Sequence, residues 1–212
     1  MTLSSFTLTG PDDIDGLSEQ WQMSATGEVD EVNINTTQLP ETLHLAAGKI
    51  QMTPNKLLFK NLNAQLMDAQ FDLTGTLQGD ISQPDRVDLS LSGDMGDKAI
   101  QYLTQSGHLP AAYAVHSPVQ FANTHIIWQS SDDFSLKGNV FFPDDVQAQT
   151  DFHYQAGHLE VKRLDIKDAD SAFTSAFCFK EDMIHLIFNG YLHNKTLERI
   201  FDAEKFSDGW LK

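Results

Sequence analysis

Apolar side chains recur at every second position through most of this 212-residue chain. Between Phe134 and Tyr154 the even-numbered positions are mostly apolar, the odd-numbered ones are mostly polar, and Pro143 begins a short turn midway. Successive side chains of a strand point to opposite faces, so this alternation predicts strands with one apolar face. Turn signals such as Pro84-Asp85 and Ala156-Gly157 separate the alternating segments. The pattern predicts a mainly β fold built as an antiparallel meander.

Two segments depart from the alternation and take the spacing of short amphipathic helices. The first, near 97–105, follows Gly93 and begins with acidic residues, which suit the positive end of a helix dipole. The second, near 195–202, follows Gly190, and Asn194 is its expected N-cap. We therefore expect two short helices, each entered from a strand that ends in glycine.

The two halves of the chain are similar to each other. A shift of 102 residues superimposes 56–80 on the second half, and downstream the shift falls to 97 because the turn around Pro84 is longer in the first half. The aligned pairs include Leu57 with Leu159, Leu62 with Leu164, Asp68 with Asp170, Phe71 with Phe173, and Gly93 with Gly190. Since apolar parity, turns and helix all keep register, we predict an internal repeat with units at 1–107 and 108–212. The units are expected to share one continuous sheet.

The repeated segments resemble the AsmA-like family of bacterial envelope proteins, which includes the TamB and YhdP proteins. The resemblance is carried by 39–50, 57–64 and 71–75 in the first unit, and by 158–171, 186–192 and 196–201 in the second. Family members similarly pass from a strand and a glycine into a short helix, and then through a segment like 208–211 into the next strand. The shared pattern covers most of the chain and consists of β-repeat features, without a catalytic motif.

This resemblance implies a long, strongly curved sheet that forms an open groove with an apolar concave face. It also implies a periplasmic role in moving phospholipids between the inner and outer membranes, with acyl chains as the bound groups. The family's amino-terminal membrane helix is absent from this sequence, which ends at Lys212 where another strand would begin. We therefore expect a segment of a longer, inner-membrane-anchored parent chain whose adjacent repeats contact this one.

The residues expected to line such a groove are aromatic and aliphatic side chains that share one strand face. They are Leu57, Phe59, Phe71, Leu73, Leu89, Leu91, Phe152, Tyr154, Phe173, Phe177, Phe179, Leu186 and Phe188. Shielding an acyl chain from water there would contribute about 0.8 kcal/mol per CH₂ group. A closed β-sandwich core produces the same alternation, so both architectures remain open on sequence grounds. Exposed sheet edges would also let two copies of an isolated chain pair edge to edge as a homodimer.

Charge narrows the class of partner. Fourteen basic residues against thirty acidic ones give a net charge of −16, which repels phosphate backbones and anionic membrane surfaces. Nucleic acid is therefore not an expected partner, whereas uncharged acyl chains are not repelled. No apolar stretch of the sequence approaches the roughly 20 residues that span a bilayer as a helix.

The sequence contains no recognisable motif for catalysis or cofactor binding. Its eight histidines lack zinc-helix spacing, and its single cysteine, Cys178, lies between two phenylalanines and is expected to be a small buried apolar residue. The acidic cluster at 12–16 lacks the third ligand of an EF-hand. Nucleophile elbows, phosphate-binding loops and dinucleotide fingerprints do not occur. We therefore expect no metal, no cofactor and no enzymatic activity.

Two functional hypotheses follow from these observations. The first is a non-enzymatic segment of an AsmA-like protein whose β-groove accommodates acyl chains. The second is a non-catalytic β-sandwich module that binds glycan or protein and keeps its apolar strands as internal core. A third, an acid–base hydrolase, has no specific residue pair to support it. The first two differ in whether the apolar positions are exposed or sealed.

Overall fold

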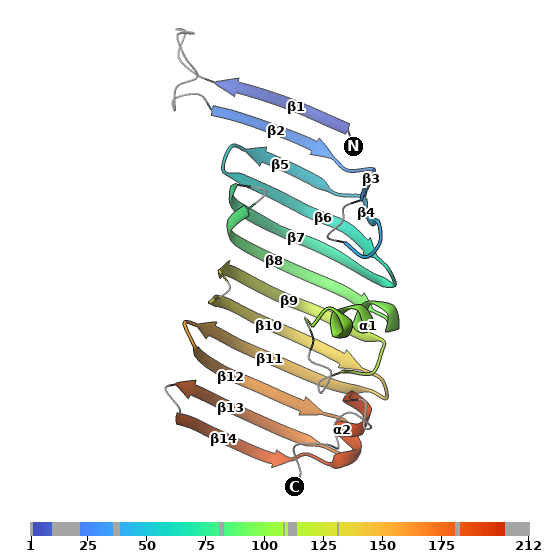
Figure 1. Ribbon diagram of the computed structural model, residues 1–212, viewed down its shortest axis with the longest axis vertical. Helices are drawn as coiled ribbons and strands as arrows, with labels where there is room; N and C mark the ends of the chain where they lie inside the picture. Colours follow the sequence, from blue (N-terminus) through green and yellow to red (C-terminus); the bar gives the residue numbers. More distant parts are fainter. Residues whose placement is uncertain are drawn as a thin grey trace.

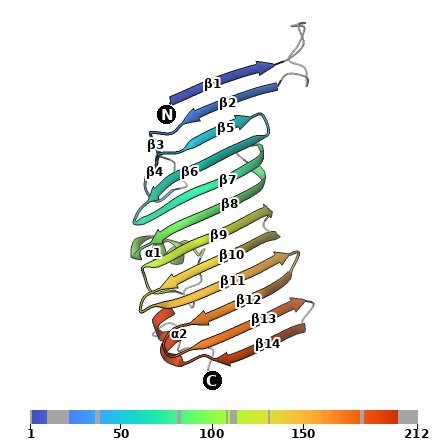
Figure 2. The ribbon, with the colours of Figure 1, turned by 180° about the vertical axis from the view of Figure 1, so that it is seen from behind.

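The computed structural model describes residues 2–9, 22–35, 39–80, 83–107, 109, 114–130, 132–180 and 183–201. The described residues form one curved antiparallel sheet of 14 strands, together with two short helices (Figures 1 and 2). β1 lies at one end of the sheet and β14 at the other. From β5 onward each strand pairs with the next one in the sequence. The prediction of a mainly β meander with two helices is confirmed.

Across the sheet the strands are β1 (Thr2–Thr9), β2 (Gln22–Glu28), β5 (Lys49–Thr53), β6 (Lys56–Leu66), β7 (Ala69–Asp80), β8 (Gln83–Met95), β9 (Val119–Ser130), β10 (Asp133–Phe142), β11 (Val146–Gln155), β12 (His158–Lys167), β13 (Ala172–Lys180) and β14 (Met183–Tyr191). The remaining two strands, β3 (Glu31–Ile34) and β4 (Leu43–Ala46), pair with each other, and β4 pairs with the second half of β6. Helix α1 (Asp97–Gln105) follows β8, and α2 (Asn194–Ile200) follows β14.

The sheet is open. β1 and β14 are its two edges, and among the described residues no second sheet is stacked on either face (Figures 1 and 2). The closed β-sandwich alternative is therefore wrong for this chain. Here the period-two alternation, which a sandwich would also produce, places the apolar side chains on one face of a single sheet.

β-Bulges occur at equivalent places in the two units. β6 has a bulge between Phe59 and Leu62, and β12 has one between Val161 and Leu164. The second bulge lies 102 residues after the first, which is the shift of the repeat. A bulge inserts one extra residue, so it moves the apolar positions from odd to even numbers within a single strand. The repeat thus extends to the irregularities of the backbone.

Two glycines also occupy equivalent places, near the ends of β8 and β14. A Cβ atom on Gly93 would lie 2.0 Å from the carbonyl oxygen of Gln70, and one on Gly190 would lie 1.9 Å from that of Ala172. Real Cβ atoms do not approach backbone that closely, so each site accepts only glycine without a shift of the strand. This close approach accounts for the glycine before each helix.

α1 begins at Asp97, as the sequence predicts, whereas the cap of α2 differs from the prediction. The backbone N–H groups of Lys98 and Ala99 in α1 donate to the carboxylate of Asp68, at 2.8 and 2.9 Å, from the turn between β6 and β7. In α2 the cap is His193, whose Nδ1 accepts from the Lys195 N–H at 3.2 Å. The prediction of Asn194 as N-cap is therefore wrong, because the extended residue before it carries a ring nitrogen that already accepts the helix N–H.

The predicted end of the second helix differs as well. α2 ends at Ile200, and Phe201 is extended and forms an isolated bridge with Val115. Position 202, the acidic cluster at 12–16 and the segment 208–211 lie outside the described residues.

Two groups of buried side chains pack on one face of the sheet. The first centres on Val29, Phe59 and Leu62, and the second on Val146, Ile166 and Ile200. Ile200 comes from α2, so the helix covers the same face that carries the strands' apolar residues. Each unit therefore has a small local core instead of a core shared between two layers.

Candidate functional site

The register of the sheet places apolar residues of ten successive strands, β5 to β14, on a common face, which we call the apolar face. Directly paired residues point to the same side of a sheet, so the pairs form rows across the strands. The first row is Met52, Leu57, Leu77, Val87, Trp128, Phe134, Tyr154, Leu159, Phe179 and Ile184. The second is Ile50, Phe59, Gly75, Leu89, Ile126, Leu136, Phe152, Val161, Phe177 and Leu186.

Two further rows complete the apolar face. The third runs through Leu62, Leu73, Leu91, Thr124, Gly138, Thr150, Leu164, Ser175 and Phe188. The fourth runs through Ala64, Phe71, Gly93, Phe121, Val140, Ala148, Ile166, Phe173 and Gly190. All thirteen residues that the sequence suggested as groove lining lie in these four rows. The structure therefore brings residues of both units onto one surface.

The sequence prediction left β9 and β10 out of this surface. Trp128 pairs with Val87 on one side and with Phe134 on the other, so these two strands join the predicted residues of the two units. The even-numbered apolar residues of β10 follow the alternation, whereas the parity of β9 is hidden in the sequence by the bulge at Asn123, which has a φ of +51°. Phe121 before it and Trp128 after it lie on the same face despite their odd and even numbers.

An aromatic cluster lies in the middle of the apolar face. The ring of Phe134 meets that of Phe152 edge-on, with centroids 5.5 Å apart, and that of Tyr154 at 5.7 Å. Trp128, directly paired with Phe134, is 36% exposed. Tyrosine and tryptophan present an apolar ring with one polar atom, a combination that suits a boundary between apolar groups and water.

Exposure along the apolar face rises toward β14. Phe59 and Leu62 in β6 are buried, whereas Leu186 and Phe188 in β14 are 55% and 65% exposed. Val32 and Leu45 of the β3–β4 branch pack against the first core and Ile200 of α2 belongs to the second, whereas β14 has no strand on its outer side among the described residues. The apolar face is thus a surface in contact with solvent and is not a sealed core.

One long side of the apolar face is bordered by other elements. The β3–β4 branch, α1 and α2 follow one another along the same side of the sheet (Figure 1). Residues 114–118 continue this border between the helices: the His116 N–H donates to the Ile200 carbonyl at 2.8 Å, and Val115 bridges to Phe201. On the opposite side, the described turns 54–55 and 156–157 join consecutive strands (Figure 2). The apolar face therefore has one walled side.

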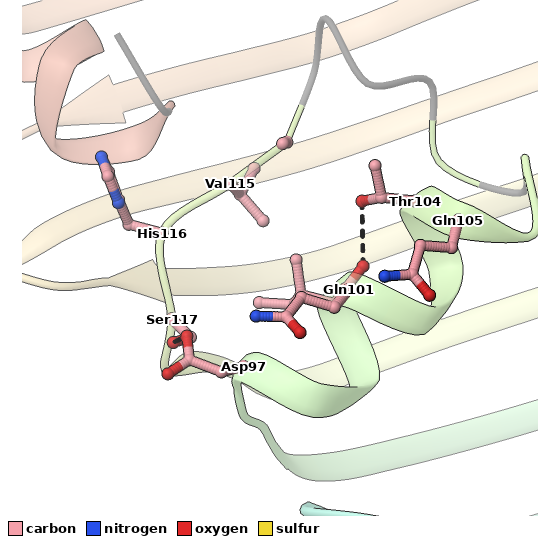
Figure 3. Close-up of a pocket in the computed structure, with 9 residues that line it drawn as sticks. Asp97, Gln101, Thr104, Gln105, Val115, His116 and Ser117 are labelled. Atoms are coloured by element: carbon pink, nitrogen blue, oxygen red, sulfur yellow. Dashed lines mark hydrogen bonds between the residues drawn. The ribbon is translucent and has the colours of Figure 1, made fainter. Parts of the chain in front are cut away.

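A small hollow lies within this wall, between α1 and residues 115–117 (Figure 3). Asp97, Gln101 and Gln105 of α1 line it, and the Ser117 hydroxyl donates to the Asp97 carboxylate. The ring of His116 points away from α1, toward α2 (Figure 3). These groups do not form a nucleophile–base pair, so the hollow is a polar gap in the wall and is separate from the apolar face.

The middle of the third row consists of small residues, Thr124, Gly138 and Thr150, which lie between Leu91 and Leu164. Thr124 is 1% exposed, and its Oγ1 has no hydrogen-bond partner. A Cβ atom on Gly138 would lie 2.5 Å from that oxygen, so the Thr124 side chain fills the space above the glycine. The small side chains of this row are thus confined to β9, β10 and β11, and leucines continue the row on both sides.

The other face of the sheet is polar. It carries paired charges such as Lys137 with Asp151, 3.1 Å apart, and His125 with Asp88, 2.8 Å apart. Phe141 is an apolar exception there, since it pairs with Gln120 and Gln147. The second face is thus mostly polar, with further apolar side chains at Ile127 and Ile187.

The strongest charged network ties α2 to the sheet. Arg199 donates to Asp168 at 2.6 Å and to Asp170 at 2.7 Å, and the Thr196 hydroxyl donates to Asp168 at 2.8 Å. Burial raises the pKa of Asp168, but the bonds from Thr196, from the Asp170 N–H and from Arg199 outweigh it and hold that pKa below its usual range. The two carboxylates in turn raise the pKa of Arg199. Arg199, Thr196 and the Asp170 N–H all donate to the carboxylates of this network, which therefore holds α2 on the sheet.

Asp68 has the corresponding role for α1. Burial raises its pKa, and the backbone N–H groups of Lys98 and Ala99 lower it by a larger amount, so the pKa of Asp68 lies below its usual range. A carboxylate at the first turn of a helix is favoured by the helix dipole as well.

The prediction of Cys178 as a buried apolar residue is wrong. It is half-buried and lies on the polar face, where its Sγ is 2.9 Å from Nε2 of His158. Its neighbours Phe177 and Phe179 point to the apolar face, so their hydrophobicity says nothing about the surroundings of the cysteine. Among the described residues, no three His, Cys, Asp or Glu side chains are grouped closely enough to hold a metal ion.

Comparison with known proteins gives no relative: no family model, no curated protein and no solved structure matches this chain. In the described part of the chain, neither helix has the length and apolar character needed to cross a bilayer.

Proposed function

We propose that this protein is a non-enzymatic segment of an AsmA-like envelope protein, in which the apolar face holds phospholipid acyl chains during their transfer between the inner and outer membranes. The proposal places the chain in the periplasm, next to further repeats of an inner-membrane-anchored parent. The observation that carries it is a continuous apolar surface across ten strands, over which the described residues place no second layer. A protein that only needs a stable core does not leave such a surface in water.

The dimensions of the apolar face support this proposal. Neighbouring strands lie about 4.8 Å apart, so ten strands extend the face over about 43 Å. Half of a bilayer's hydrocarbon core, the length of one acyl chain, is about 15 Å. An acyl chain could therefore lie along the rows completely within the face, and could move along it without leaving apolar surroundings.

The energetics favour an acyl chain over a charged ligand. Each CH₂ group removed from water contributes about 0.8 kcal/mol, and this contribution requires no specific geometry. At Gly138 and Thr150 the apolar face carries small residues beside the larger Leu136 and Phe152 of the second row. The open side of the face, where Trp128 is exposed, leaves space for a hydrated headgroup in water. Binding of this kind needs no catalytic residue.

The test is lipid retention by matched variants. We expect phospholipid to copurify with the wild-type chain, as detected by extraction and by native mass spectrometry. Trp128→Glu places a charge on the apolar face at a partly exposed position and should reduce bound lipid several-fold. Phe141→Glu places the same charge on the polar face, one strand away, and should leave lipid binding unchanged.

The outcomes separate the hypotheses. Loss of lipid in Trp128→Glu, with an unchanged circular dichroism spectrum and with lipid retained in Phe141→Glu, supports the groove. A lipid-free wild-type protein that binds a glycan or a protein would favour the binding-module hypothesis and contradict the proposal. Equal lipid binding by both variants would show that the apolar face is not the site.

A further inference from the structure

The edge strand β14 exposes large apolar side chains on both of its faces. Leu186 and Phe188 on the apolar face are 55% and 65% exposed, and Ile187, on the polar face, is 76% exposed. β13 pairs with all nine residues of β14 on one side, and the other side has no partner strand among the described residues. An edge of this kind has a row of backbone N–H and C=O groups available for pairing.

The equivalent strand in the first unit shows what such an edge accepts. β8 corresponds to β14 through the shift of 97 residues, and its outer side is paired antiparallel with β9. That pairing places Phe121 opposite Gly93 and Ile126 opposite Leu89, so apolar residues meet on the apolar face. β14 has the apolar character of an interior strand, but within the described residues no strand pairs with its outer side.

β14 contains none of the residues that usually keep an edge strand from pairing with another chain. Residues 183–191 contain no Asp, Glu, Lys, Arg or Pro, although the chain has 30 acidic and 14 basic residues. The adjacent β13 has a single charge, Lys180. Natural edge strands usually carry charges, prolines or bulges that prevent pairing with another chain. Neither β13 nor β14 contains acidic side chains that would repel a second copy, although the whole chain has a net charge of −16.

We propose that two copies of this chain pair through β14, antiparallel, about a two-fold axis at Ile187. In this register Ile187 faces Ile187 of the second copy, Leu186 faces Phe188, and Ile184 faces Gly190. Because Ile187 is the central residue of Met183–Tyr191, this register pairs all nine residues of the strand. It is self-complementary, as a two-fold interface must be.

This register also preserves the division of the two faces. Even-numbered residues of β14 lie on the apolar face and pair with even-numbered residues of the second copy, while odd-numbered residues pair with odd-numbered ones. The two apolar faces therefore merge into one surface across both copies. A register displaced by one residue would place apolar-face residues opposite polar-face residues and expose both. The inference concerns the 212-residue chain by itself, in which β14 is the outer strand of the described sheet, and it does not depend on whether the apolar face binds lipid.

The first experiment compares two lysine substitutions by analytical ultracentrifugation. Ile187→Lys changes a side chain that is already in solvent, so it should not affect folding of the single chain. In the pair, two lysines would face each other at the axis, and we expect the wild-type dimer to become a monomer. Gln120→Lys, on the polar face of β9, adds the same charge far from the axis and should leave the dimer intact.

The second experiment tests the register with cysteines, in a Cys178→Ala background that removes the native thiol. Directly paired residues have Cα atoms about 4.5–5.5 Å apart, a distance that a disulfide can bridge. Ile187→Cys should therefore form a covalent dimer on oxidation, roughly tenfold faster than His185→Cys, whose own copy lies four residues away along the strand.

Each outcome decides the proposal. A wild-type dimer that Ile187→Lys dissociates, together with rapid crosslinking of Ile187→Cys only, supports it. A monomeric wild-type chain at micromolar concentrations, or a dimer that Ile187→Lys leaves intact, would overturn it. Equal crosslinking of the two cysteine variants would overturn the register. A monomer that binds a synthetic peptide of residues 119–130 at β14 would assign this edge to a β9-like strand and would also overturn pairing with a second copy.

Discussion

Leu89 in β8 and Leu186 in β14 occupy equivalent positions in the two units, 97 residues apart and both in the second row of the apolar face. Leu89 has strands on both sides and packs against the core around Phe59, whereas Leu186 is 55% exposed at the end of the sheet. The same residue type in the same local structure thus has two environments. The burial of a side chain therefore depends on the neighbouring strand, and the hydrophobic pattern of its own strand does not determine it.

The units also differ in how each helix is attached. In the first, Asp68 accepts directly from two backbone N–H groups of α1. In the second, Thr196 occupies the position of Ala99, and its hydroxyl joins Asp168 and Ser171 below α2. The backbone of the repeat is preserved while the side chains that hold the helix are exchanged. The following substitutions test these contrasts, with stability measured in the Ile187→Lys background so that self-association does not contribute.

The largest contrast is expected between the two glycines. Gly93→Ala inserts a Cβ between β7 and β9, where neither neighbour can move, and we expect the free energy of unfolding to fall by about 3 kcal/mol. Gly190→Ala makes the same clash, but β14 has a free side, so a smaller loss of about 1–2 kcal/mol is expected. Urea denaturation measures both. Equal losses would show that the outer strand does not relieve strain at the edge.

The next contrast is between the equivalent leucines. Leu89→Ala removes a side chain packed against the first core and should lower the free energy of unfolding by about 2–3 kcal/mol. Leu186→Ala removes a side chain that is largely in solvent, and the loss should stay below about 1 kcal/mol. Both variants are compared by thermal and urea unfolding. A large loss in Leu186→Ala would mean that β14 is covered in solution.

The attachments of the two helices should differ by less. Thr196→Val removes a buried hydroxyl and leaves Asp168 and Ser171 each without one partner, so a loss of about 1–3 kcal/mol is expected. Asp68→Ala removes a helix cap, which costs about 1 kcal/mol. Hydrogen exchange of the α1 and α2 amides locates each effect. Loosening of both helices by either variant would contradict independent attachment.

The smallest effect is a dependence on pH that both units share. The pKa values of Asp68 and Asp168 are lowered in the folded chain, so their stabilisation is complete above the unfolded value of about 4 and is lost as the pH falls through the folded values. Asp68→Asn and Asp168→Asn should each flatten the loss of stability below about pH 4. Urea midpoints measured across this range give the slope, and an unchanged slope in both variants would contradict the assignment.

The sequence predicted a large part of the fold because its signals are local. Period-two alternation depends only on the geometry of a strand, and the glycines that precede the helices reflect contacts within a few strands. Errors arose where a single residue changes the local geometry. The positive φ of Asn123 shifts the parity of β9, and the ring of His193 replaces Asn194 as the cap of α2. Neither feature has a distinctive pattern in the sequence.

For the candidate site, the sequence predicted which face carries the residues but not how exposed each one is. All thirteen suggested residues lie on the apolar face because parity alone assigns a side chain to a face. Their different exposure was not predictable, since Phe59 and Phe188 have the same side chain and differ only in what surrounds them. Cys178 was placed wrongly because its phenylalanine neighbours point to the opposite face.

By itself, the sequence determined that the chain alternates apolar and polar faces in repeated antiparallel strands, and that a helix follows a glycine in each unit. The tertiary structure alone decided that these strands form one open layer, with a walled side and a free edge at β14. The physical reason is that alternation depends on the geometry of one strand, whereas closure depends on whether distant strands pair. β1 and β14 do not pair, so the apolar face remains a surface.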